Sequence, residues 1–169
     1  MKTLLAPDLF RPPVRPGSPR RGSRPPLHAG EDPLREKASA AGLRALREAD
    51  LHRTVERLAA AGTSVRVGRY TLVEPRQDPA DRLAQTQAVV RRQGWQATVT
   101  TFDSTGVSDP AIRPQMARLY AALCRGEIHG IVAVSQVDIS AFHDVYADTL
   151  TVLRARGGFL ALARHETTI

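Results

Sequence analysis

The chain of 169 residues has one cysteine, Cys124, which excludes an internal disulfide and any zinc site that needs several cysteines. It has no apolar run near the ~18–20 residues that a membrane-spanning helix requires. The stretch that begins at Met1 meets charge and proline too early for the apolar part of a secretion signal. We therefore expect no membrane partner and a location in the reducing cytoplasm.

The phosphate-binding loops of nucleotide-dependent enzymes are also missing. Neither a G-x-x-x-x-G-K-[ST] segment nor a G-x-G-x-x-G segment after a strand occurs, so nucleotide hydrolysis and dinucleotide chemistry are not indicated. The five histidines lack metal-ligand spacing. We expect no cofactor, and the expected role of Cys124, beside Leu123 on a predicted helix, is packing.

Proline and basic residues are plentiful but unevenly distributed. The formal net charge is +7, and most of the 12 prolines lie between Pro7 and Pro33. Residues 1–33 have too few apolar side chains to offset chain entropy, so they are predicted to form a disordered basic leader. The leader could contact DNA phosphates weakly and without sequence specificity, or it could be a solvated segment only. Its arginines are Arg11, Arg15, Arg20, Arg21 and Arg24.

Residues 34–62 are typical of a helix. Alanine, leucine, arginine and glutamate dominate, and Gly62 is a plausible stop signal. Apolar residues recur at a spacing of three or four, which predicts one buried stripe. The stripe consists of Leu43, Leu46, Leu51, Val55 and Leu58. It could pack on the domain that follows or on a second copy of the chain, so a homodimer is one expectation.

From residue 64 onward, segments typical of strands and helices alternate. Strands are predicted over 65–73, 96–102, 128–134 and 159–163, and helices over 81–93, 114–125 and 142–156. Because single helices separate the strands, parallel pairing with right-handed crossovers is expected. The sequence predicts an α/β domain over residues 64–169, with an open, mostly parallel sheet of about four strands and flanking helices.

Three carboxylates follow predicted strands: Glu74, Asp103 and Asp138. In open α/β sheets, chemistry takes place outside the carboxyl ends of the strands. Together these residues could hold Mg²⁺, which prefers oxygen ligands, and could support a phosphodiesterase. The alternative is that each carboxylate caps a loop or the helix that follows it.

The most specific motif runs from Phe102 to Met116, where an aspartate is followed by a serine and by the pair Arg113-Pro114. This segment resembles the corresponding part of the catalytic domain of serine recombinases, the resolvase/invertase family. Weaker matches follow the order of the family's motifs, at residues 66–74, 77–95, 126–134, 137–140 and 153–158. The resemblance covers about residues 66–165 and implies the same α/β fold.

The family's chemistry makes four departures of this chain important. In that family a serine at the end of the first strand attacks a DNA phosphodiester, and arginines around the phosphate stabilise the developing charge. The resemblance places Glu74 at the nucleophile's position and leaves Arg113 and Asp138 as matches to the catalytic set. Apolar residues stand at three positions where the family has arginine: Leu72, Ile139 and Phe142.

These departures predict a catalytically inactive, resolvase-like pseudoenzyme that acts as a DNA-associated or interaction module. A carboxylate about 4 Å from a phosphate would repel it by about 4 kcal/mol at an effective dielectric of about 20. Loss of one charge-stabilising group typically lowers a rate by ~10²–10³. The family continues into a DNA-binding module, and we expect none after the last strand of this chain.

Three other functions are left open by the sequence. The chain could be an active site-specific DNA recombinase, or a fragment of one, whose unrecognised nucleophile is Ser64, Ser104 or Ser135. It could be the Mg²⁺-dependent phosphodiesterase described above. It could also be a structural partner domain with the helix over 34–62 as its interface.

Overall fold

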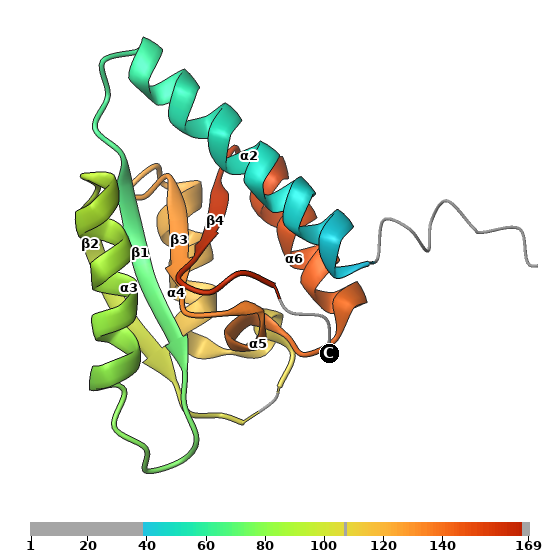
Figure 1. Cartoon of the computed structure of the whole chain (residues 1–169). Coiled ribbons are helices and arrows are strands. Elements are labelled where there is room, and N and C mark those ends of the chain that lie inside the picture. The colour runs from blue at the N-terminus through green and yellow to red at the C-terminus, as the bar shows by residue number, and fades with distance from the viewer. Residues whose placement is uncertain (1–38, 107, 167–169) are drawn as a thin grey trace, which may run out of the picture. The chain divides into compact units, whose positions relative to one another are not determined.

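The computed structural model describes residues 39–106 and 108–166 (Figure 1). Four strands form one parallel sheet in the order β2-β1-β3-β4. The strands are β1 (Arg66–Leu72), β2 (Gln96–Asp103), β3 (Gly130–Ala133) and β4 (Phe159–Leu162). The predicted α/β class, with an open parallel sheet of four strands, is confirmed. The leader predicted over 1–33, with its five arginines, lies outside the described residues.

The two edge strands, β2 and β4, differ in burial, because α2 packs along β4. Every residue of β3 and β4 is buried, which fits their continuous apolar sequences. The edge strand β2 exposes most of its residues and is rich in threonine, a β-branched residue suited to a half-exposed strand.

Short helices connect the strands, and their ends lie close to the predicted positions. They are α3 (Ala80–Gln93), the 3₁₀ turn η1 (Pro110–Ile112), α4 (Pro114–Cys124), α5 (Gln136–Ile139) and α6 (His143–Ala155). Gly94 ends α3 in the left-handed conformation, with φ of 67°. Pro114 occupies the first turn of α4, where its missing N–H is tolerated. The sequence pattern does not predict α5, because four residues are too few to show a helical period.

Two apolar clusters cover the two faces of the sheet. On one face, Tyr70 of β1 and Ile131 of β3 pack with buried residues of α4 and α6. On the other face, Val67 and Val132 pack with Val89 of α3. The alternation within β1 explains this division, because successive side chains of a strand point to opposite faces.

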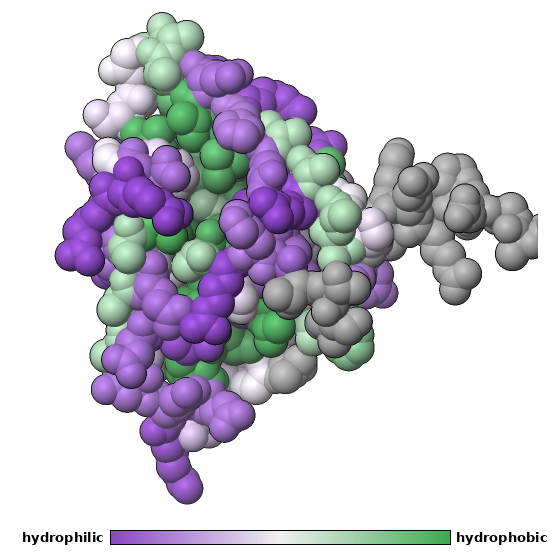
Figure 2. Space-filling view, viewed as in Figure 1, coloured by the Kyte–Doolittle hydropathy of each residue, from purple (hydrophilic) through white to green (hydrophobic). Residues whose placement is uncertain are grey.

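The long helix α2 (Ala40–Ala60) lies along β4 and α6 of its own domain (Figure 1). Its outer side is mostly hydrophilic (Figure 2). The buried stripe differs from the predicted one, because Leu46, Leu51 and Val55 are only half-buried. The buried positions are Leu43, Arg47, Asp50, Thr54 and Leu58. The predicted stripe does pack on its own domain, since Leu46, Leu51 and Val55 contact the two cores, but buried polar residues accompany it.

An ion pair explains why a charged residue can be buried on α2. Arg47 donates from Nε to Glu166 Oε1 at 2.6 Å and from Nη2 to Glu166 Oε2 at 3.1 Å. The Tyr146 hydroxyl of α6 donates to the same Oε1 atom at 2.8 Å. The bidentate pair ties α2 to the segment that follows β4.

Within the described ranges, no helix has the length and apolar character needed to cross a bilayer.

Candidate functional site

Asp138 lies at the carboxyl end of the sheet, in α5, and its carboxylate accepts five hydrogen bonds. Oδ1 accepts from Thr71 Oγ1 at 2.7 Å and from the Leu72 N–H at 2.9 Å. Oδ2 accepts from the N–H and the hydroxyl of Ser135, both at 2.9 Å, and from Arg82 Nη2 at 2.7 Å. Asp138 thus joins the end of β1 to α3 and closes the first turn of α5 as a capping box with Ser135.

Arg82 is a member of this network that sequence reasoning missed. Its Nε donates to Thr71 Oγ1 at 2.8 Å, while its Nη2 pairs with the buried carboxylate of Asp138. The side chain is 28% exposed, so it is a cation accessible from solvent at this edge of the sheet. The position, between Asp81 and Leu83 in the first turn of a helix, carries no sequence signal of this role.

Arg113 is buried, with 1% of its surface exposed, although it carries a charge. It is the largest fully buried side chain among the described residues. Its Nη1 donates to the main-chain carbonyl of Asp138 at 2.6 Å and approaches the Tyr70 hydroxyl at 3.4 Å. Its Nε donates to the carbonyl of Ser108 at 3.0 Å, and Nη2 donates to the same oxygen. All three guanidinium nitrogens are engaged inside the protein, where they hold the loop before α4 against α5.

Asp103 fills the amino end of α4. Its Oδ1 accepts from the Gln115 N–H and its Oδ2 accepts from the Met116 N–H, each at 3.1 Å. The Tyr70 hydroxyl donates to Oδ2 at 3.2 Å. Burial raises the pKa of the Tyr70 phenol, so this group is a neutral donor at physiological pH. Asp103 is therefore a helix cap, as one of the two readings of the sequence expects.

Glu74 lies beyond the end of β1 in an exposed turn. The carbonyl of Glu74 accepts from the Gln77 N–H at 3.0 Å, and the Gln77 side chain accepts from the Glu74 N–H at 3.1 Å. Pro75 and Arg76 occupy the centre of this turn, and Arg76 has a positive φ of 71°. A type II turn requires positive φ at this position, which glycine adopts at lower cost. The Glu74 carboxylate itself has no partner in the described part of the chain.

The three carboxylates do not form the magnesium site that the sequence left open as one alternative. Among residues 39–106 and 108–166, no group of three or more histidine, cysteine, aspartate or glutamate side chains could hold a metal ion. Asp103 and Asp138 accept hydrogen bonds from neighbouring groups, while Glu74 is exposed. The Mg²⁺ hypothesis was wrong, because carboxylates at the ends of strands in one sheet need not point toward one another.

The positions at which the resemblance expects arginine have different environments. Ile139 is fully buried in the core, with 0% exposure, and Leu72 packs against the same core from its edge. Phe142 is 63% exposed just before α6. The three serines considered as nucleophiles also differ in their surroundings. Ser64 and Ser104 are exposed, whereas the Ser135 hydroxyl donates to the Asp138 carboxylate.

One buried polar group near Asp138 has no partner. The amide nitrogen and oxygen of Gln136 are both buried, and neither forms a hydrogen bond within the part of the chain that the structure describes. Gln136 is 4% exposed and opens α5. An unsatisfied buried amide is destabilising.

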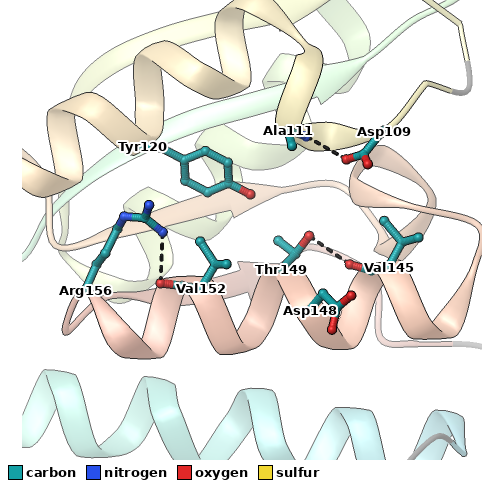
Figure 3. Close-up of a pocket in the computed structure, with 8 residues that line it drawn as sticks. All are labelled: Asp109, Ala111, Tyr120, Val145, Asp148, Thr149, Val152 and Arg156. Carbon is teal, nitrogen blue, oxygen red and sulfur yellow. Dashed lines mark hydrogen bonds between the residues drawn. The ribbon is translucent and has the colours of Figure 1, made fainter.

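A hollow of about 450 Å³ lies away from these residues, between η1 and α4 on one side and α6 on the other (Figure 3). The Tyr120 ring points into it, and the guanidinium carbon of Arg156 lies 5.5 Å from the centre of this ring. Burial raises the pKa of the Tyr120 phenol. None of the residues proposed from the sequence for catalysis lines this hollow.

Comparison with solved structures relates this architecture to two enzymes. The N-terminal catalytic domain of TP901-1 integrase matches with a TM-score of 0.50 and 19% identity, over 57% of this chain and 76% of that chain. The C-terminal catalytic domain of ISC1926 TnpA, an IS607-like serine recombinase, matches with a TM-score of 0.52 and 10% identity, over 59% of this chain and 70% of that chain. The fold is that of a serine recombinase catalytic domain.

This result confirms the fold that the resemblance implied. At such low identities the likeness concerns the fold alone, so the chemistry of the serine recombinase fold in this chain depends on its own residues. No protein-family model and no curated protein sequence matches this chain.

Proposed function

We propose that this chain is a non-cleaving, recombinase-like domain that associates with DNA or with a protein partner and does not exchange DNA strands. The observation that carries the proposal is the engagement of Arg113 and Asp138 within the domain. Arg113 donates to main-chain carbonyls at 1% exposure, and Asp138 accepts from five donors. Neither group can contact a phosphate without breaking hydrogen bonds that hold α5 in place.

The surroundings of the nucleophile's position support the same conclusion. Phosphodiester cleavage by a side chain requires a nucleophile and preorganised cations around the phosphate. An exposed carboxylate, Glu74, stands where the family has serine, and it would repel the substrate. Ile139 adds a fully buried methyl-rich side chain where a cation is expected, so this position has no path to solvent.

DNA is the partner class that the fold favours most, because an integrase and a serine recombinase are among the structures that resemble it. The carboxyl edge of the sheet offers two accessible cations, Arg76 and Arg82, which could contact phosphates. Contacts by the leader arginines, a homodimer and a cytoplasmic location are further parts of this proposal. No base-specific recognition is included, since these groups recognise charge.

The proposal is tested with the full chain and a negatively supercoiled plasmid at low salt. We expect the plasmid to stay supercoiled after protein removal, while a mobility shift reports binding that weakens steeply as salt rises. Conversion to nicked or linear plasmid would overturn the absence of cleavage. A missing mobility shift would remove DNA as the partner and leave the protein-interaction role.

A second candidate is strand cleavage with Ser135 as the nucleophile. Its hydroxyl donates to Asp138 Oδ2, a carboxylate that could accept the proton as the serine oxygen bonds to phosphorus. The bond from phosphorus to the sugar oxygen breaks in the same step, and the sugar oxygen takes up a proton from solvent. Arg82 pairs with the same oxygen and is the nearest accessible cation. A Ser135→Ala variant distinguishes this candidate, because any plasmid nicking by Ser135 must vanish in the variant and persist in Ser104→Ala.

A further inference from the structure

A cluster of three arginines lies at the amino edge of the sheet, opposite the edge that carries Asp138. Arg53 and Arg57 belong to the second half of α2, and Arg154 belongs to the last turn of α6. The Arg57 Nη2 donates to the carbonyl of Gly157 at 2.9 Å, immediately before β4 begins. The cluster therefore joins the ends of two helices that Figure 1 shows side by side near the start of β4.

A buried carboxylate fixes two of these arginines. Asp50 accepts from Arg53 Nη1 at 3.0 Å and from Arg154 Nε at 2.9 Å. The Asp50 side chain is 6% exposed, whereas Arg53 and Arg154 are 65% and 43% exposed. The cluster has three guanidinium groups, and Asp50 pairs with two of them, so positive charge is in excess on groups that face solvent.

Most of the hydrogen-bond donors in the cluster are unused. A guanidinium group has five N–H donors, and in the described part of the chain each of these three arginines engages one nitrogen only. Between them lies a hollow of about 180 Å³, lined also by Asp50, Gly157 and Gly158. This volume far exceeds the ~10–15 Å³ that one water molecule requires, so the hollow can admit a phosphate group.

The positive potential extends beyond the hollow. Burial lowers the pKa of the His129 imidazole, and the charges of Arg66 and Arg57 lower it further. Arg66 lies at the start of β1 and donates to the Gly126 carbonyl at 2.7 Å. The cations thus continue along the amino edge of the sheet from α2 toward β1.

We propose that Arg53, Arg57 and Arg154 form a binding site for a phosphate group. Arginine suits this ligand because its planar fork can donate two parallel hydrogen bonds to phosphate oxygens. Asp50 holds two of the guanidinium groups in place before binding, which reduces the entropy lost on binding. The phosphate is either free or part of a nucleic-acid backbone. The site goes beyond the proposed function, since it lies at the opposite edge of the sheet and requires no recombinase chemistry.

Titration calorimetry of the full chain with inorganic phosphate at low ionic strength tests the site. We expect saturable binding that is about tenfold weaker in Arg57→Gln and unchanged in Arg118→Gln, an exposed arginine of α4 that removes the same charge elsewhere. Arg57→Gln leaves both Asp50 ion pairs intact and removes one exposed hydrogen bond, to the Gly157 carbonyl, so its thermal unfolding temperature should change little. A second variant, Arg53→Gln, should weaken phosphate binding similarly.

The absence of saturable phosphate binding would overturn the proposal, as would equal weakening in Arg57→Gln and Arg118→Gln. A parallel titration with a fluorescent DNA duplex distinguishes the two sources of phosphate. A selective loss of duplex affinity in Arg57→Gln identifies the nucleic-acid backbone, whereas duplex affinity equal in both variants identifies a free phosphate. Either of these results, together with the calorimetric loss, supports the site. Nicking of plasmid by the chain would overturn the proposed function but leave this site unaffected.

Discussion

The Nη1 atom of Arg113 donates to the main-chain carbonyl of Asp138 at 2.6 Å, so the two charged residues that match the recombinase pattern are linked through backbone. The carboxylate of Asp138 faces a different set of donors, on β1, α3 and α5. Together, the hydrogen bonds of Arg113 and Asp138 fix the loop before α4 and the first turn of α5. This arrangement gives both residues a structural role that is independent of any substrate.

Replacement of Arg113 should therefore destabilise the domain. Arg113→Ala leaves the carbonyls of Ser108 and Asp138 without buried donors, and we expect a loss of about 2–4 kcal/mol in the free energy of unfolding. Chemical denaturation monitored by circular dichroism measures the change. The exposed control Arg118→Ala should change it by less than about 0.5 kcal/mol. Equal stability of the two variants would contradict the structural role.

Removal of the Asp138 carboxylate should be more damaging. Asp138→Ala leaves Arg82 and four further donors without their acceptor, including the Thr71 and Ser135 hydroxyls. We expect a loss of about 3–5 kcal/mol, the range seen when one partner of a buried ion pair is removed. Asp144→Ala, at an exposed position of α6, is the control for thermal unfolding. A melting temperature equal to that of the control would argue against this network.

Gln136 provides a prediction of the opposite sign. Its buried amide forms no hydrogen bond among the described residues, so Gln136→Met removes an unsatisfied group at similar volume. We expect a gain of about 1 kcal/mol in the free energy of unfolding. Gln93→Met, at the exposed end of α3, is the matched control. Destabilisation by Gln136→Met would show that the amide has a partner in solution.

The Arg47–Glu166 pair makes stability depend on pH. Burial alone would raise the pKa of the Glu166 carboxyl, but hydrogen bonds from Arg47 and Tyr146 hold it below its ordinary value of 4.5. Because the folded-state pKa is the lower one, this contribution is present above pH 4.5 and is lost as the pH falls through the folded-state pKa. Glu166→Gln should remove that part of the acid sensitivity, whereas the exposed control Glu56→Gln should keep it. Parallel denaturation curves at pH 7 and pH 3 measure both.

Reinstating the family's arginine should fail at position 139. Ile139 is fully buried within the main core, so an arginine there would carry an unpaired charge into an apolar site. We expect Ile139→Arg to lower the free energy of unfolding by more than about 3 kcal/mol, while Phe142→Arg, at an exposed position, should change it little. Comparable melting temperatures for the two variants would show that Ile139 can turn outward.

Most of the fold could be predicted because local signals and topology agree. The apolar run at 128–134, the glycine at 94 and the proline at 114 mark one strand and two helix ends, and the structure has them there. The buried polar residues of α2 could not be predicted, because Arg47 is buried through a partner 119 residues away in the chain. Such pairing leaves no periodic pattern in the sequence.

The candidate site shows the same limit. Arg113 and Asp138 emerge from the family resemblance, but Arg82 pairs with a residue 56 positions away and carries no motif. The three carboxylates considered as magnesium ligands do not converge on one site, for a related reason. The order of elements in the sequence places Asp103 and Asp138 at the carboxyl ends of two strands of one sheet. The direction of each carboxylate, however, depends on which helix or loop offers N–H donors.

The most direct test of the central claim is a search for a covalent protein–DNA adduct. The full chain is incubated with supercoiled DNA, denatured, and resolved on a gel that separates free protein from protein attached to DNA. We expect all protein to run free, because the Glu74 carboxylate would repel the phosphate and Arg82, the cation nearest to Ser135, is paired with Asp138. A protein band carrying DNA, mapped by mass spectrometry to a serine of this chain, would contradict the account.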